Sequence, residues 1–282
     1  MVAVKKIGKL EAEIITVGRE VLTGKTLNTN SQWLSGKITA LGGVVRRHIT
    51  VDDRVQDIAK AVEESLNRGV DLIIVTGGLG PTFDDVTREG LAEAFKRKLR
   101  LNDSAVQMIT QRYSQLRGLR EEEVKLTGLQ RRMAEMPEGS KPVMNPVGVA
   151  PGIVHECGST LTVAMPGVPK EVEGIFESYV EPLIRRRVGG FQLYELNLLI
   201  AGVSESIIAP MVGEAMKNYA PIYIKSHPMG ASLIKLDITC GGKDVKEVGD
   251  RVLSAASFIL RRILQGFNDC SGTRVVNHPF NS

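Results

Sequence analysis

Two adjacent carboxylates, Asp84 and Asp85, directly follow the glycine-rich segment 77–82 (GGLGPT). Glycine lets the backbone approach a ligand closely, and free amides at the start of a helix attract an anion. Capping explains one acid at a helix start, but two acids beside a phosphate would repel it unless a divalent metal lay between them. The pattern predicts a phosphate-binding segment with two metal ligands: Gly77, Gly78, Gly80, Pro81 and Thr82 for the phosphate, Asp84 and Asp85 for the metal.

A second glycine-containing segment, 18–26 (GREVLTGKT), looks at first like a P-loop. The P-loop pattern has four residues between its glycines, whereas five separate Gly18 from Gly24, so we reject an ordinary P-loop. The segment still follows the first expected strand, and doubly wound sheets bind ligands at such strand ends. Two interpretations stay open: a simple loop in which Asn28 caps the next helix, or a crevice lined by Glu20, Thr23, Lys25, Asn28 and Asn30, with Gly18 at the strand end also binding the ligand.

Two further turns could complete the same crevice. Asp53 follows the second expected strand, although an acid at this position is also a common helix N-cap. The turn at 166–169 (PGVP) follows a later strand and opens a helix. It could close the far side of the site through Pro166, Gly167 and Pro169, or it could be an ordinary turn.

The elements that must position these residues alternate between strands and helices. Apolar runs predict strands at 12–17, 44–51, 70–75 and 159–165, and apolar residues at helical spacing predict helices at 28–41, 53–67, 86–98, 104–117 and 170–179. The run at 70–75 is nearly all apolar, as expected of a strand buried on both faces. Alternation of this kind predicts an α/β fold with a doubly wound, mostly parallel sheet.

The order of elements changes after the segment 185–190 (RRRVGG). Strands are expected at 191–201, 222–226 and 231–240, with helices at 204–217 and 246–264, which is the order of a small α+β domain. We therefore expect a doubly wound α/β domain at 9–187, an α+β domain at 190–266 and a loosely held tail at 267–282.

The composition excludes several classes of protein. The chain has 282 residues, of which 43% are hydrophobic and 24% charged, so extensive disorder is excluded. Cys157, Cys240 and Cys270 are scattered, without the spacing of a zinc site or a disulfide scaffold. No apolar run approaches the roughly 20 residues of a membrane span, and we expect a cytoplasmic protein. The basic clusters at 96–100, 131–132 and 185–187 carry no interleaved aromatic residues apart from Phe95, so we expect solvated faces rather than a nucleic-acid partner.

Taken together, the motifs resemble those of the CinA family and, more broadly, the MoaB/Mog molybdopterin-binding fold. They are the segments 17–20 (VGRE), 24–30 (GKTLNTN), 77–85 (GGLGPTFDD) and 166–169 (PGVP), and the resemblance covers about 11–185. The segment 202–206 (GVSES) and the element order after it resemble the KH-like domain of CinA proteins. Bacterial relatives continue into a nicotinamide-mononucleotide deamidase domain, which we do not expect in a chain of this length.

The resemblance implies a metal-dependent diphosphatase that hydrolyses ADP-ribose or a related dinucleotide such as FAD to AMP and a phosphorylated product. Asp85 matches an acid shared by both branches of the fold, Asp84 one typical of CinA proteins, and Asp53 and Glu20 two further acids of the site. The resemblance also implies a divalent metal (Mg, Mn or Co) and a homodimer or larger homo-oligomer. Arg19 departs from the family pattern. The alternative is a protein that binds molybdopterin or a nucleotide without hydrolysis.

Overall fold

The computed structural model describes residues 10–230, 232–267, 275 and 276. The chain divides into two compact units, residues 1–188 and 189–282. Each unit has its own cluster of buried apolar side chains. The two units are therefore described separately.

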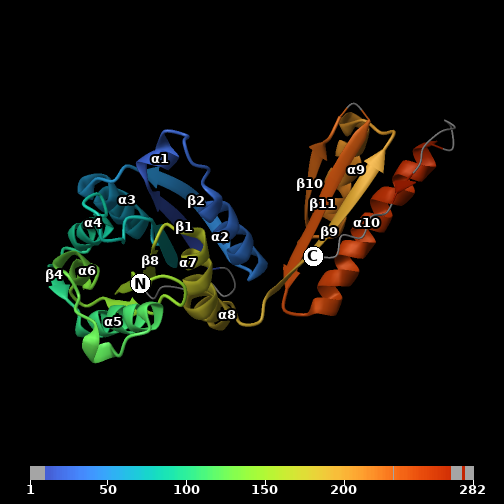
Figure 1. Ribbon diagram of the computed structural model, residues 1–282. Coiled ribbons are helices and arrows are strands. Elements are labelled where there is room, and N and C mark those ends of the chain that lie inside the picture. Colours follow the sequence, from blue (N-terminus) through green and yellow to red (C-terminus); the bar gives the residue numbers. More distant parts are fainter. Residues whose placement is uncertain (1–9, 231, 268–274, 277–282) are drawn as a thin grey trace, which may run out of the picture. The chain divides into compact units, whose positions relative to one another are not determined.

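A six-stranded sheet forms the centre of the first unit (Figure 1). Its order is β2-β1-β3-β8-β7-β6, made of β1 (Glu11–Val17), β2 (Val44–Val51), β3 (Leu72–Thr76), β6 (Lys141–Val143), β7 (Gly152–Cys157) and β8 (Thr160–Met165). The pairs β1–β2, β1–β3 and β3–β8 are parallel, whereas β7 runs antiparallel to both of its neighbours. The predicted α/β fold with a mostly parallel sheet is confirmed.

Helices cover both faces of this sheet. They are α1 (Arg19–Leu22), α2 (Thr29–Ala40), α3 (Val55–Arg68), α4 (Thr87–Ala94), α5 (Asp103–Arg117), α6 (Gly128–Arg132), α7 (Pro169–Ile175) and α8 (Glu181–Val188), with the 3-10 turn η1 (Glu121–Glu123) and the π-helical segment η2 (Phe176–Val180). One core joins α3, α4 and α5 to Ile15, Ile73 and Val75 of the sheet. On α2, Trp33 packs edge-on against Phe176, with ring centres 5.3 Å apart. The helices thus form a three-layer unit with the sheet in the middle.

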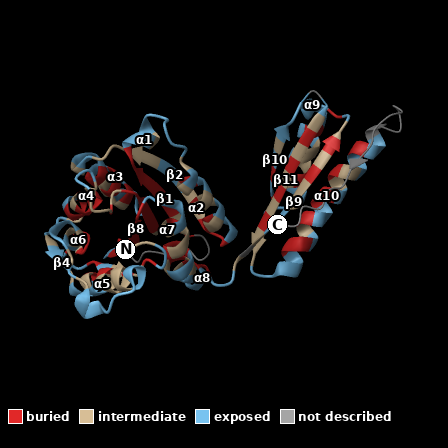
Figure 2. Cartoon of the chain, in the orientation of Figure 1, coloured by how far each residue is buried: buried red, intermediate tan, exposed pale blue. Residues whose placement is uncertain are grey.

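The inner strands are buried more completely than the edge strand β2, as Figure 2 shows in red. Every residue of β3 and β8 is buried, because helices cover both faces of these strands. On β2, by contrast, Arg46, Arg47 and His48 are exposed. Carboxyl ends of buried parallel strands form a rigid edge from which loops can present functional groups.

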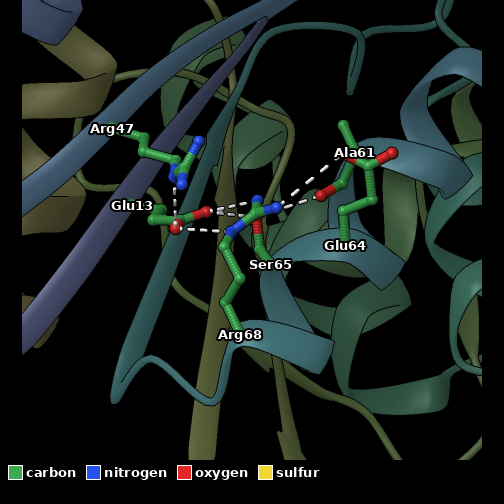
Figure 3. Close-up of polar contacts among 6 residues, drawn as sticks. All are labelled: Glu13, Arg47, Ala61, Glu64, Ser65 and Arg68. Carbon is green, nitrogen blue, oxygen red and sulfur yellow. Dashed lines mark hydrogen bonds and ion pairs between the residues drawn. The ribbon is translucent and has the colours of Figure 1, made fainter.

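A buried carboxylate ties α3 to the sheet (Figure 3). Glu13 of β1 is 1% exposed, and its Oε1 and Oε2 accept hydrogen bonds from Nε and Nη2 of Arg68 at 2.8 and 2.7 Å. The Ser65 hydroxyl donates to the same carboxylate at 2.6 Å, and Arg47 of β2 forms an ion pair with it at 3.6 Å. Burial by itself would raise the pKa of Glu13, but the bonds from Arg68 and Ser65 and the charge of Arg47 outweigh it and lower that pKa.

One local prediction about a helix is wrong, and one of the alternatives left open above is excluded. The helix expected at 86–98 ends at Ala94, because Lys96 has φ 54° and the following residues form β4 (Leu99–Leu101) against β5 (Glu135–Pro137). Asp53 does not cap α3, since the helix begins at Val55 and Asp53 instead accepts a hydrogen bond from the Arg19 amide at 2.8 Å. The end of α4 is determined by the pairing of β4 with β5, and the position of Asp53 by its contact with the Arg19 amide. Both interactions depend on the tertiary fold.

The second unit is a four-stranded antiparallel sheet with two helices. Its order is β10-β11-β9-β12, made of β9 (Gln192–Ala201), β10 (Tyr223–Pro228), β11 (Leu233–Gly242) and β12 (Val275–Val276), with α9 (Glu205–Asn218) and α10 (Val245–Phe267). Alternate residues of β11, among them Leu236 and Ile238, are buried in its core. The expected loose tail at 267–282 lies mostly outside the described residues, although Val275–Val276 pair with β9.

Candidate functional site

A cavity of about 640 Å³ lies at the carboxyl edge of the central sheet. The loops that follow the parallel strands β2, β1, β3 and β8 line it, one beside the next, in the order of these strands in the sheet. At the far end, the loop that precedes the antiparallel strand β7 also lines it. Most of the residues predicted for the site line this cavity: Gly18, Glu20, Asp53, Gly77, Gly78, Gly80, Pro81, Thr82, Asp84, Asp85, Pro166 and Gly167. The structure therefore brings together residues that lie up to about 150 positions apart in the sequence.

The floor of the cavity is the loop between β3 and α4. Gly77 has φ 102°, and a Cβ there would lie 2.2 Å from the carbonyl oxygen of Val17. The Thr87 hydroxyl donates to the Gly77 carbonyl at 2.8 Å, and the Thr87 amide donates to the Gly78 carbonyl at 3.1 Å. The first residue of α4 thus fixes the loop against the strand end. Only glycine can pass so close to the neighbouring strand in this conformation.

Three backbone amides of this loop are free to bind a ligand. Among the residues that the structure describes, the amides of Gly78, Leu79 and Gly80 have no hydrogen-bond acceptor. Consecutive free amides in a turn form a concave site for an anion. The loop therefore has the groups that a phosphate requires.

Asp84 and Asp85 converge on one hydroxyl group. Oγ1 of Thr82 lies 2.5 Å from Oδ1 of Asp84 and 2.6 Å from Oδ2 of Asp85, and the Thr82 amide also donates to Asp85 at 2.8 Å. The hydrogen bond from Thr82, followed by one from its own amide, lowers the pKa of Asp84. A hydroxyl has one proton, so it can donate to only one of the two carboxylates at a time. A cation between them would relieve the remaining repulsion.

These two carboxylates fit a Mg²⁺-like ion better than a zinc ion. Such an ion is commonly held by one or two carboxylates together with phosphate oxygens of the ligand. Within the part of the chain that the structure describes, no group of three or more His, Cys, Asp or Glu side chains is arranged to hold a metal by itself. A metal at Asp84 and Asp85 would therefore depend on oxygens from a ligand or from water.

Further carboxylates surround one end of the cavity. Burial raises the pKa of Asp53; the Arg19 amide opposes this, while Glu20, Asp52 and Asp84 raise the pKa further. Arg19 forms an ion pair with Asp52 at 3.2 Å. The charge of Arg19 is thus partly balanced by Asp52.

The opposite end of the cavity was missed at the sequence level. It is lined by Tyr113 of α5, Met133, Glu171 of α7 and residues 148–150. Nε of Arg112 donates to the Gly148 carbonyl at 2.8 Å, and Nδ2 of Asn145 donates to Glu171 at 2.6 Å, so this loop is held from two sides. The turn-forming segment 145–152 (NPVGVAPG) could have indicated it, since its Pro and Gly residues directly precede β7.

Five residues predicted for the site do not line the cavity: Thr23, Lys25, Asn28, Asn30 and Pro169. The Thr23 hydroxyl donates to the Arg19 carbonyl at 2.9 Å at the end of α1. Asn28 caps α2 by accepting from the Ser31 amide at 3.1 Å, which is the structural alternative stated above. Asn30 donates to the Gly167 carbonyl at 2.8 Å and so supports the wall, and both Asn30 and Pro169 line a neighbouring groove beside Trp33.

Comparison with known proteins decides the family. Residues 13–186 match the family model described as "Probable molybdopterin binding domain". The chain belongs to this family. The match spans all six strands of the central sheet except the first two residues of β1, so every described cavity residue lies within it.

Relatives of similar length support this assignment. The chain is 39% identical to a protein of Aeropyrum pernix over 267 residues, which cover 93% of this chain and 95% of that protein. It is 42% identical to a protein of Sulfurisphaera tokodaii over 248 residues, covering 86% and 91%. The crystal structure of CinA from Thermoplasma acidophilum, described as a protein of unknown function, is 38% identical with a TM-score of 0.56. It covers 62% of this chain and 98% of its own.

The structure also bears on membrane association. Among the described helices, none combines the length and apolar character required to cross a bilayer.

Proposed function

We propose that the cavity binds a phosphorylated pterin or nucleotide, with its phosphate on the loop 77–82. The observation that carries this proposal is the set of three free amides at Gly78, Leu79 and Gly80, at the carboxyl edge of the sheet. A volume of about 640 Å³ suits a ligand of this size. Membership of a family described as molybdopterin-binding supports molybdopterin as one such ligand.

Binding is tested by calorimetric titration and thermal shift with ADP-ribose, FAD, ADP, adenosine and a pterin phosphate. We expect at least one phosphorylated compound to bind and to raise Tm, and adenosine to bind far more weakly. Absence of binding by every phosphorylated compound, with and without Mg²⁺, would contradict the proposal.

A pair of glycine variants links binding to the loop. A Cβ at Gly80 would lie 2.6 Å from Oδ2 of Asp85, so Gly80→Ala must displace this carboxylate. We expect Gly80→Ala to lower the affinity about tenfold or more. Gly128→Ala is the matched control, because nothing lies within 4 Å of a Cβ at Gly128. Equal affinities of the two variants would show that the loop does not contact the ligand.

A second candidate is metal-dependent hydrolysis of a diphosphate, and the convergence of Asp84 and Asp85 on Thr82 favours it. Asp84 and Asp85 would hold a divalent metal, which would supply Lewis-acid polarisation of a phosphoryl oxygen. Asp53, whose pKa burial raises, would act as the general base that accepts the proton of the attacking water. The loop amides would hold the diphosphate in place.

Hydrolysis is tested by product analysis after incubation of ADP-ribose or FAD with Mg²⁺, Mn²⁺ or Co²⁺, with EDTA as the control. If the protein is a diphosphatase, AMP forms only with metal, and Asp85→Asn forms none while its Tm stays close to that of the wild type. If a ligand binds but no AMP forms under any of these conditions, hydrolysis is excluded and only the non-hydrolytic binding function remains.

A further inference from the structure

The cavity presents a charge problem for a phosphate ligand. Five carboxylates line it: Glu20, Asp53, Asp84, Asp85 and Glu171. Among the described residues that line it, none is a lysine or an arginine. A phosphate on the loop would therefore meet negative charge without a cationic side chain in direct contact.

A positive charge lies directly beneath the loop instead. Arg88 of α4 is 1% exposed, although arginine is rarely buried without a charged partner. Its Nη1 donates to the Leu79 carbonyl at 2.6 Å, and its Nη2 donates to the carbonyls of Gly80 and Asp85 at 2.9 and 3.2 Å. All three acceptors are backbone groups of the segment that forms the cavity floor or its rim.

These bonds determine how the loop amides point. In a planar trans peptide, the carbonyl of one residue and the amide of the next point in opposite directions. Because Arg88 holds the Leu79 carbonyl, the Gly80 amide must point away from the guanidinium. The Gly80 amide is one of the three free amides described above.

The charge of Arg88 is incompletely balanced within the described residues. No carboxylate forms an ion pair with it, its Nε has no hydrogen-bond partner, and the neighbouring Glu89 pairs with Arg132 at 2.8 Å. Burial lowers the pKa of Arg88 despite the nearby carboxylates of Glu89, Asp85 and Glu135, so these carboxylates do not fully offset the cost of burying its charge. A phosphate on the other side of the loop would supply that anion across a single layer of backbone.

We propose that Arg88 is a positioning residue that makes the loop 77–82 an anion site, without touching the ligand. It does so by orienting the backbone of the loop and by placing a buried, only partly balanced positive charge under it. This proposal rests on the proposed function, since it requires a phosphate on the loop. It gives the acidic cavity its selectivity for a phosphorylated ligand over the corresponding unphosphorylated one.

The experiment measures the affinity of the full chain for pyrophosphate, ADP and adenosine by calorimetric titration. Arg88→Met removes the charge and all three hydrogen bonds at similar length, and Arg88→Lys keeps the charge but cannot reach three carbonyls in the same fork geometry. Arg131→Met is the matched control, because Arg131 is exposed on the nearby α6. Circular dichroism and Tm report whether each variant is folded.

We expect Arg88→Met to weaken pyrophosphate and ADP binding about 10- to 100-fold, and Arg88→Lys to recover part of that loss. Adenosine binding and the Arg131→Met variant should stay within about twofold of wild type. A merely structural role for Arg88 would weaken ADP and adenosine alike. If Arg88→Met does not fold, Arg88→Lys is compared with wild type instead. The proposal then predicts that Arg88→Lys loses affinity for pyrophosphate and ADP but not for adenosine.

Two results would overturn the proposal in different ways. If wild type binds pyrophosphate and ADP and the folded Arg88 variants bind them equally well, the role of Arg88 is rejected, but the phosphate site is not. Failure of the wild type to bind any phosphorylated probe would reject it together with the phosphate site in the proposed function.

Discussion

The acidic side chains around the cavity lie close enough for their charges to repel each other. Partial burial also limits how well water can solvate these charges. Asp53 shows this best, since burial and the neighbouring Glu20, Asp52 and Asp84 all raise its pKa. Groups with unfavourable charges of this kind concentrate in functional sites, where a ligand or metal compensates them. The same groups make the unliganded protein less stable than it could be.

Asp53→Asn should therefore stabilise the unliganded protein at neutral pH. Because the folded-state pKa of Asp53 is raised, its ionisation opposes folding as the pH rises above the unfolded-state value of about 3.9. The asparagine removes this effect and can still accept from the Arg19 amide. We expect Tm to rise by about 1–3 °C at pH 7, and the difference to shrink towards pH 4.

Thermal unfolding of the variant and the wild type across this pH range provides the check. A lower Tm for Asp53→Asn at pH 7 would show that the hydrogen bond between Asp53 and the Arg19 amide outweighs the charge repulsion.

Residue types predicted the acidic and glycine-rich parts of the cavity, but not its other end. Asp84, Asp85 and the glycines could be selected because their types and spacing suit phosphate and metal. Tyr113 and Glu171 carry no such signature, and they reach the cavity only through the packing of α5 and the position of α7. Arg88 was missed for a similar reason, since nothing in a helical sequence marks an arginine as buried.

At the scale of elements, the ion pair of Glu13 and Arg68 holds α3 against β1, the strand that leads to Gly18. Glu13→Gln should destabilise the first unit by about 3 kcal/mol, because Arg68 would lose a buried carboxylate partner. The pKa of Glu13 is lowered in the folded state, so its stabilising effect is present above about pH 4.5 and is lost as the pH falls. The variant should therefore lie further below wild type at pH 7 than at pH 4.

Urea unfolding at both pH values measures this effect. Glu64→Gln is the matched control, because Glu64 contacts the same Arg68 at 3.7 Å but is 52% exposed. We expect this control to change stability by less than about 0.5 kcal/mol. Equal losses in the two variants would contradict a special role for the buried carboxylate.

The parallel strands were predictable because they are apolar, whereas two antiparallel strands were not. The strand β7 begins in a segment rich in Gly and Pro, and β6 has only three residues, so neither shows a clear alternation. The helix expected at 170–179 continues through η2 into α8, so the basic run 185–187 lies within a helix. The strands β6 and β7 depend on pairing and packing with their neighbours, which the local sequence does not show.

At the scale of the molecule, the cavity belongs entirely to the first unit. Leu236 of β11 is fully buried in the separate core of the second unit. Leu236→Ala should destabilise that unit by about 3 kcal/mol and leave ligand affinity within about twofold of wild type. Differential scanning calorimetry, combined with titration of the ligand that binds wild type, tests both expectations. A loss of affinity in the folded variant would show that the second unit contributes to the site.

The net charge of +4 does not by itself explain how an anion would bind. The residues described as lining the cavity include acids but no basic side chain, although lysines and arginines outnumber acids in the chain as a whole. In the proposed site, the favourable charge would come from one buried arginine and from backbone amides, neither of which composition reveals. Whole-chain charge is therefore a poor guide to the sign of a site's ligand.

The cavity is assembled from segments that begin at Val17 and end at Glu171. During synthesis on the ribosome, the last of its walls emerges only after most of the first unit has been made. A partly folded chain therefore has no complete pocket, and a ligand can select only the finished fold. At a concentration 100 times its Kd, such a ligand would add about 2.7 kcal/mol to the stability of the native state. Supply of the ligand in the cell would then help to determine how long each copy of the protein survives proteolysis.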